Sequence, residues 1–173
     1  MEMQTIIPVG TELELRPATV AHVADMFVVL SDPKIYRYLD DEPPPSIEHL
    51  HSVYQRREKR WSPDGSEQWL NWVVCPGGSK PVGFVQATII NASTAWIAYV
   101  FGSKHWGKGY AHAATDAMID HLGEVYGITN YMATVEMENT RSIRLLERLS
   151  FRLATSQEAQ CRDLSSTELL YVR

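Results

Sequence analysis

The sequence contains few cysteines, and this limits the sites that they could form. Only Cys75 and Cys161 occur among its 173 residues. Two cysteines are too few for a disulfide framework or for a zinc site built on cysteine. We therefore expect two free thiols in a reducing compartment, with no nucleophilic role for either.

Basic residues are also in the minority. The chain has 16 Lys and Arg against 21 Asp and Glu, which gives a formal net charge of −5. A general nucleic-acid binder needs a basic face that displaces counterions, so we expect no nucleic-acid partner.

Long apolar segments are absent as well. A helix that crosses a bilayer needs about 20 mostly apolar residues, and no such run occurs. The first ten residues carry Glu2 and lack the basic segment and apolar core of a secretory signal. We expect no membrane partner and a cytoplasmic location.

The residues that are present suit one compact domain, spanning residues 1–173. A hydrophobic fraction of 45% and a charged fraction of 21% are ordinary for a globular protein, and the length suits a single folding unit. The proline run at 43–45 is too short to be an interdomain linker.

The first half of the chain predicts a strand, two helices and three further strands. A short strand at 13–15 precedes Pro17, and helical spacing of apolar residues follows Thr19 and Ser46, each a candidate N-cap. The acidic, proline-rich segment 40–45 predicts an exposed loop. Turn signals separate strands at 69–75, 82–90 and 95–101, which favour an antiparallel meander.

The second half alternates helices and strands. We expect a helix at 109–126, a strand at 130–135, a helix at 140–149, and strands at 151–155 and 167–172. This alternation implies at least one parallel crossover. The predicted fold class is therefore α/β, a mixed sheet with helices on both faces.

The most informative segment joins the strand at 95–101 to the helix that begins near Gly109. Gly107 and Gly109 let backbone amides approach a ligand, and a helix start leaves unpaired N–H groups at the positive end of a dipole. Both features are typical of a phosphate or pyrophosphate site. The segment is neither a P-loop nor a dinucleotide fingerprint, because His112 stands where the last glycine of G-x-G-x-x-G is required. On glycines alone, a tight turn before a helix is an equally good interpretation.

Two segments resemble the GNAT acetyltransferases. Residues 106–111, WGKGYA, are similar to the acetyl-CoA signature Q/R-x-x-G-x-G/A, in the form common in the branch of the ribosomal-protein N-terminal (Rim-type) acetyltransferases. Residues 138–151 are similar to the segment N-x-x-S-x-x-x-x-E-K-x-G-F of the same family. The two motifs occur in the family's order, one helix and one strand apart.

The resemblance implies a GNAT-like fold, whose mostly antiparallel central sheet is splayed between the fourth strand, 95–101, and the fifth, 130–135. It also implies acetyl-CoA as co-substrate, with the pyrophosphate on the loop and helix start and the pantetheine arm beside the fourth strand. Asn139 matches an asparagine that commonly hydrogen-bonds this arm; it could also cap the next helix, and both roles are compatible. The implied cofactor-binding residues are Tyr99, Val100, Phe101, Gly102, Trp106, Gly107, Lys108, Gly109, Tyr110, Ala111, Asn139 and Arg144.

The implied reaction is attack of a neutral amine on the thioester. The amine must lose a proton, the oxyanion must be stabilised, and the thiolate must be protonated or stabilised. The family's usual oxyanion donor is a backbone N–H at the end of the fourth strand. Many members supply a tyrosine for the thiolate, but Leu146 occupies the comparable position here. Ser142 matches a serine proposed for that role, and a serine bonded to local backbone is an equally good interpretation.

The general base is less defined. The glutamate that some members carry on the fourth strand is missing, and Glu136 and Glu138 are the candidates, on one strand face if the strand continues. An α-amino group has a pKa of about 8 and needs little assistance at neutral pH. We favour no dedicated base, with Glu136 as second choice.

One position departs from the family's pattern. Ser150 stands where the family has a glycine before phenylalanine. Glycine suits a left-handed residue that ends a helix, so serine could cost about 1 kcal/mol there.

The six histidines do not indicate a metal site. His49 and His51 would point in different directions on a helix, and no H-E-x-x-H string occurs. We expect no metal.

These observations predict an N-acetyltransferase acting on a primary amine, either a peptide or protein N-terminus or a small molecule; a homodimer is left open. The alternative is a catalytically weak or inactive acyl-CoA-binding module, because the tyrosine and the fourth-strand glutamate are absent. A nucleotide-binding protein unrelated to the family is disfavoured by the failed motifs. We expect the acidic loop at 40–42 to attract a cationic amine, while cations gather near the two helix starts: Lys104, Lys108, Arg141 and Arg144.

Overall fold

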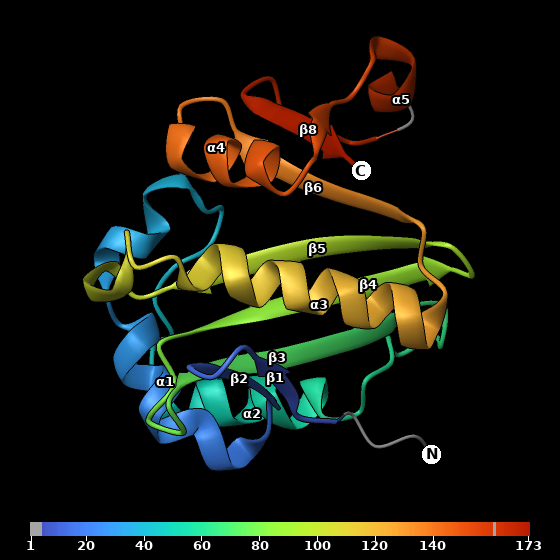
Figure 1. The fold of residues 1–173 in the computed structure, drawn as a ribbon. Coiled ribbons are helices and arrows are strands. Elements are labelled where there is room, and N and C mark those ends of the chain that lie inside the picture. Colours follow the sequence, from blue (N-terminus) through green and yellow to red (C-terminus); the bar gives the residue numbers. More distant parts are fainter. Residues whose placement is uncertain (1–4, 161) are drawn as a thin grey trace.

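A single mixed sheet organises the residues that the computed structural model describes, which are 5–160 and 162–173 (Figure 1). Its strand order is β1-β2-β3-β4-β5-β6-β8-β7. Only β5 and β6 are parallel neighbours, and the other pairs are antiparallel. The strands are β1 (Ile7–Val9), β2 (Leu13–Pro17), β3 (Gln68–Pro76), β4 (Gly83–Asn91), β5 (Thr94–Phe101), β6 (Asn130–Glu136), β7 (Arg152–Leu153) and β8 (Glu168–Val172).

Helices lie on both faces of this sheet. One core cluster packs α3 and α4 against one face, and a second cluster packs α1 and α2 against the other. In Figure 1, α3 crosses in front of β4 and β5. The predicted fold class is confirmed. The helices are α1 (Val23–Leu30), α2 (Ile47–Arg57), α3 (Tyr110–Tyr126), α4 (Thr140–Arg148) and α5 (Ser156–Gln160), with 3-10 turns η1 (Val20–His22), η2 (Pro33–Tyr38) and η3 (Ser103–His105).

Most of the predicted long elements are present. The meander of β3, β4 and β5 is antiparallel as expected, and Ser46 caps α2 by accepting a hydrogen bond from the His49 amide at 3.1 Å. The helix predicted after Thr19 is divided into η1 and α1. The strand predicted at 151–155 shortens to the two residues of β7. The sequence analysis missed β1, η2 and α5, which are too short for a clear periodicity.

Cys75 is buried and free, and burial raises the pKa of its thiol. Cys161 lies outside the described residues.

No helix in the described part of the chain has the length and apolar character needed to cross a membrane.

β5 and β6 diverge soon after they meet. Their parallel pairing joins residues 94–96 to residues 130–132 and then stops. Beyond that point β5 continues to Phe101 beside β4, and β6 continues to Glu136 beside β8. Figure 1 shows the two strands separating toward the ends that carry η3 and α4. The predicted splay is therefore present between these two strands.

The end of α4 carries a left-handed serine. Ser150 has φ of 64°, a conformation that glycine adopts without cost and most other residues avoid. Its amide donates to the Glu147 carbonyl at 3.0 Å, which closes the last turn. The predicted left-handed helix end is confirmed at this residue.

We expect Ser150→Gly to raise the free energy of unfolding by about 0.5–1 kcal/mol, because it relieves the left-handed strain. Chemical denaturation measures the change. Ser52→Gly is the matched control: Ser52 is exposed inside α2, where glycine should instead lower the stability by about 0.5 kcal/mol. A loss of stability in Ser150→Gly would contradict the strain argument.

Candidate functional site

The loop between β5 and α3 is shaped by two left-handed glycines. Gly107 and Gly109 have φ of 76° and 81°, and a Cβ at either position would meet no other atom within 4 Å. The space in front of both residues is therefore open. Gly109 precedes α3 without a side-chain cap, and the first helical bond runs from the Ala113 amide to the Gly109 carbonyl. The amides of the first turn remain available to an anion.

Trp106 connects this loop to two other elements. Its indole Nε1 donates to the Phe101 carbonyl at 2.8 Å, at the end of β5. The Arg141 guanidinium, at the start of α4, lies 4.0 Å from the centroid of the Trp106 ring. A cation over an aromatic face at this distance is attractive. The Trp106 side chain thus holds the loop, β5 and α4 together.

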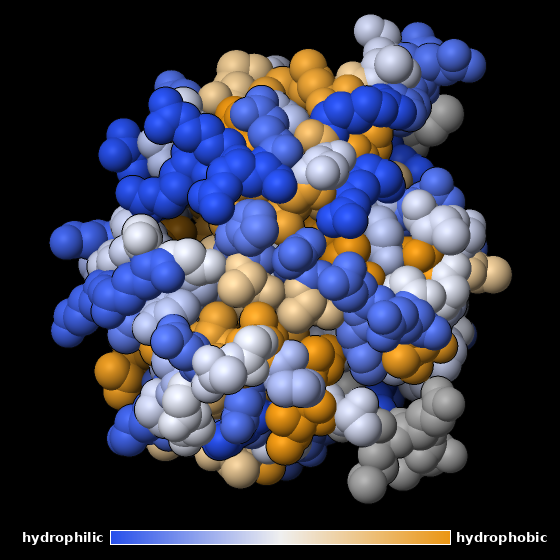
Figure 2. Space-filling view, in the orientation of Figure 1, coloured by the Kyte–Doolittle hydropathy of each residue, from blue (hydrophilic) through white to orange (hydrophobic). Residues whose placement is uncertain are grey.

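Cationic side chains surround the same loop. Lys104 and Lys108 are exposed on it. Burial lowers the pKa of His105 between them, and the charges of Lys108 and Lys104 lower it further. Arg144 is exposed on α4, three residues after Arg141 and hence on the same side of the helix. Figure 2 shows strongly hydrophilic side chains over the α4 region. The predicted cations at 104, 108 and 141 therefore lie around one loop.

A hydrogen bond joins β5 to α4 across the space where β5 and β6 diverge. The Tyr99 hydroxyl on β5 lies 2.6 Å from the Ser142 Oγ on α4, and 3.4 Å from the Ser142 carbonyl. Burial raises the pKa of Tyr99 to about 12, although the Ser142 contact opposes the rise. The hydroxyl of Ser142 thus contacts a side chain of β5, whereas the local capping is done by Asn139, whose Oδ1 accepts from the Ser142 amide at 3.2 Å. Sequence reasoning selected Tyr99 for its strand position and missed this side-chain contact.

The two candidate bases lie in different structural settings. Glu136 is the last residue of β6 and is partly buried, opposite Glu168 of β8. The strand ends there, so Glu138 falls in an exposed turn and does not share a strand face with Glu136. Glu136 and Glu138 were predicted to share a strand face only if the strand continued, and it ends at Glu136. Among the described residues, no three His, Cys, Asp or Glu side chains gather in a way that could hold a metal ion.

Asp32 is a residue that sequence reasoning missed. Its carboxylate accepts from the Ser103 amide at 2.9 Å and from the Lys34 amide at 3.1 Å. Hydrogen bonds from Ser103 hold its pKa below the usual value. Asp32 therefore fastens the start of η3 to η2. Only an Asp before proline marks it in the sequence, and that pattern predicts a local turn cap and not a contact with a residue so far along the chain.

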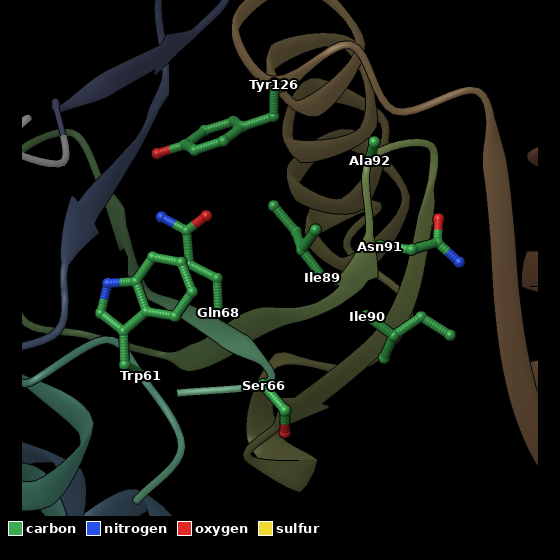
Figure 3. Close-up of a pocket in the computed structure, with 8 residues that line it drawn as sticks. All are labelled: Trp61, Ser66, Gln68, Ile89, Ile90, Asn91, Ala92 and Tyr126. Atoms are coloured by element: carbon green, nitrogen blue, oxygen red, sulfur yellow. The ribbon is translucent and has the colours of Figure 1, made fainter. Parts of the chain in front are cut away.

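A separate pocket lies at the other end of α3. Figure 3 shows the Trp61 ring, the Gln68 amide and the Tyr126 ring facing one space beside the β4–β5 turn. None of its lining residues is acidic or basic. The 17 residues of α3 separate it from the glycine loop by about 25 Å. The lining residues are Trp61, Ser66, Gln68, Ile89, Ile90, Asn91, Ala92 and Tyr126.

Family and sequence comparisons give matches over most of the chain. The model of the acetyltransferase (GNAT) domain matches residues 12–152. The uncharacterized N-acetyltransferase p20 of Bacillus licheniformis is 29% identical over 124 residues, which are 70% of this chain and 68% of that protein.

Solved structures share the fold. RimL, a ribosomal L7/L12 alpha-N-protein acetyltransferase in complex with coenzyme A, superposes with a TM-score of 0.81 at 22% identity, covering 98% of this chain and 97% of RimL. The microcin C7 self immunity acetyltransferase MccE, in complex with acetyl-CoA and AMP, has a TM-score of 0.77 at 19% identity, covering 95% of this chain and 93% of MccE. At these identities the likeness establishes a common fold.

Proposed function

The chain belongs to the GNAT acetyltransferase family, and from this premise we propose that it transfers the acetyl group of acetyl-CoA to a primary amine. One observation carries the proposal: the matched domain includes a glycine loop with open space, unpaired amides and surrounding cations at the start of α3. The acceptor is either a peptide N-terminus or a small molecule.

The residues of the loop fit the phosphates of acetyl-CoA. Gly107 and Gly109 leave room for a ligand to approach the backbone, which a side chain at either position would obstruct. The backbone amides of the first turn, which begins at Tyr110, lie at the positive end of the α3 helix dipole. Lys104 and Lys108 add positive charge, and Arg144 adds more from α4.

The divergence of β5 and β6 fits the pantetheine arm. Beyond Trp96, the backbone groups of β5 that face β6 have no strand partner among the residues that the structure describes. Buried or ligand-facing backbone groups need hydrogen-bond partners. We assign this edge, from Tyr99 to Gly102, to the arm and to the carbonyl oxygen that gains negative charge as the amine attacks. Asn139 keeps its capping role and leaves its amide nitrogen for the arm.

Ser142 and Tyr99 suit the departing thiolate. Acetyl-CoA supplies the acetyl group as a thioester, and the sulfur leaves as an anion that a hydroxyl can stabilise. Because its pKa is about 12, Tyr99 stays protonated at neutral pH and acts as a donor and not as a base. We assign the contact with the sulfur to Ser142, and the orientation of its hydroxyl to Tyr99.

Proton removal requires no dedicated base in this proposal. An α-amino group with a pKa of about 8 is partly neutral at physiological pH. Glu136 remains the second choice, as the partly buried carboxylate at the end of β6. The cytoplasmic location and the homodimer stay predictions.

An acceptor screen tests the proposed reaction. We expect free coenzyme A thiol to appear when the protein is mixed with acetyl-CoA and the correct amine, in a panel of peptides, amino acids and polyamines. Calorimetry of acetyl-CoA binding is run beside it. Binding without turnover across the panel would favour the acyl-CoA-binding alternative, which the buried Leu146 in the tyrosine position supports. An absence of binding would contradict both functions.

Gly109→Val tests the loop. We expect it to weaken acetyl-CoA binding at least about 10-fold, because valine disfavours the left-handed backbone and fills the ligand space. Gly65→Val is the matched control, since Gly65 has φ of 74° and equally open surroundings away from the loop. Equal affinities in a folded Gly109→Val protein and the wild type would contradict our placement of the site.

Ser142→Ala and Tyr99→Phe test the hydroxyl pair. We expect Ser142→Ala to lower kcat about 100-fold, the usual size of one proton-donor contribution, with little change in the KM for acetyl-CoA. Tyr99→Phe should lower kcat less, and the double variant should resemble Ser142→Ala because the two side chains act together. Ser52→Ala serves as control for an exposed helical serine. Full turnover in Ser142→Ala would leave the hydroxyl with a structural role alone.

A further inference from the structure

A hollow of about 320 Å³ lies between α2 and the sheet, on the face opposite α3. This volume is near the lower end of small-molecule sites, which span about 300–1,000 Å³. The lining residues are Val53, Arg56, Arg57, Trp69, Asn71, Gln86, Ala87 and Thr88. None of them is acidic, so the charge of the hollow comes from its two arginines.

The floor of the hollow is polar. Asn71 of β3 and Gln86 of β4 are cross-strand partners, as are Trp69 and Thr88, and the alternation of side chains places all four on the α2 face. The side-chain amides of Asn71 and Gln86 make no hydrogen bond to another described residue, although Asn71 is only 8% exposed. Such amides on a largely apolar sheet face are free to bind a ligand.

Arg57 lines the hollow and has no carboxylate within ion-pair distance among the described residues, although the charge of Asp41 acts on it from farther away. Its guanidinium carbon lies 5.8 Å from the Tyr54 ring centroid and 5.4 Å from the Phe84 centroid. Within the described chain it makes neither an ion pair nor a hydrogen bond. Burial lowers its pKa, while the charge of Asp41 partly opposes this. The aromatic rings compensate some of the lost hydration, but five N–H donors remain without acceptors.

The hollow is connected to the reaction site through one strand. Gln86 pairs with Ala98 of β5, and Ala98 is the neighbour of Tyr99 on the opposite face of the sheet. A molecule held between Arg57 and Gln86 thus lies beside the stretch of β5 that we assigned to the thioester. Neighbouring strands lie about 4.8 Å apart, so the unpaired edge of β5 is one to two strand spacings from Gln86, and the acceptor has to span that distance between its carboxylate and its amine.

We propose that Arg57, with Asn71 and Gln86, binds a carboxylate of the acceptor, so that the preferred acceptor is a small primary amine that also carries a carboxylate, separated from the amine by about the length of a dipeptide. This inference rests on the acetyl transfer proposed above. A guanidinium binds a carboxylate through two parallel hydrogen bonds, and the two amides add further donors. The acidic loop at 40–42 had suggested a cationic acceptor, whereas the lining of this hollow favours an anionic group.

Matched acceptor pairs test the inference. Coenzyme A release is measured with dipeptides and tripeptides and with the same molecules as carboxamides. We expect kcat/KM to be about 10- to 100-fold higher for the acids, as for the loss of one charged hydrogen-bonded pair. Amidation lowers the pKa of the neighbouring amine, so a larger fraction of the carboxamide is in the reactive neutral form. A preference for the acid would oppose this effect and would therefore come from recognition of its carboxylate.

Arg57 variants assign the preference to this residue. Arg57→Met keeps the apolar volume and should raise the KM for acids until acids and amides are equal, with the KM for acetyl-CoA unchanged. Arg57→Lys should keep part of the preference, and Arg148→Met, at an exposed position of α4, should keep all of it. Equal kcat/KM for acids and amides in the wild type, or an intact preference in Arg57→Met, would overturn the inference.

Binding measurements separate the inference from the proposed function. Calorimetry with carboxylate-bearing amines in the presence of coenzyme A needs no turnover. Binding that disappears in Arg57→Met without any acetyl transfer would support the carboxylate site and count against the function. Acetyl transfer to amides and acids alike would support the function and reject the carboxylate site.

Discussion

The short pairing of β5 with β6 is the constraint on which the rest of the structure depends. The two parallel strands share only the register from 94–96 to 130–132, and their continuation on separate partners leaves an unpaired edge inside the molecule. Backbone groups at such an edge are costly unless something binds them. The Tyr99–Ser142 hydrogen bond and the contact of Arg141 with the Trp106 ring connect the β5 side to α4, which follows β6. A sheet that paired fully would have no place for an extended ligand.

Trp106 explains how the loop can be both open and ordered. The two left-handed glycines give the loop backbone many accessible conformations, and ordering it in one of them costs conformational entropy. The indole bond to β5 and the stacking of Arg141 fix the loop from one side, and Asp32 fixes the start of η3 from the other. The ligand side of the loop therefore needs no protein contact. Trp106, the first residue of the motif, therefore contacts β5 and α4 with its side chain and leaves the other side of the loop open.

The sequence predicted the elements whose pattern depends on residues close together in the chain. Helical periodicity predicted α3 nearly to the residue and the start of α2 after Ser46, and turn residues divided the meander correctly, because both depend on neighbours in the chain. The glycine loop followed from its motif. What could not be predicted joins distant residues: Tyr99 to Ser142, Asp32 to Ser103, and Arg57 above a floor from two strands. Short elements such as β1 exist only because a neighbouring strand pairs with them.

Positively charged side chains lie on both sides of β5, and their positions bear on the proposed acetyl transfer. Cations around Trp106 serve one side of β5, and Arg56 and Arg57 line the hollow on the other, although the whole chain carries −5. A carboxylate beside an ammonium group raises its pKa, and a cation lowers it. None of the lining residues of the hollow is acidic, although the charge of Asp41 acts on Arg57. A site of this kind can dispense with a strong base, which agrees with the absence of a glutamate from β5. In the proposed carboxylate site, the positive charge of Arg57 would also lower the pKa of a nearby acceptor amine.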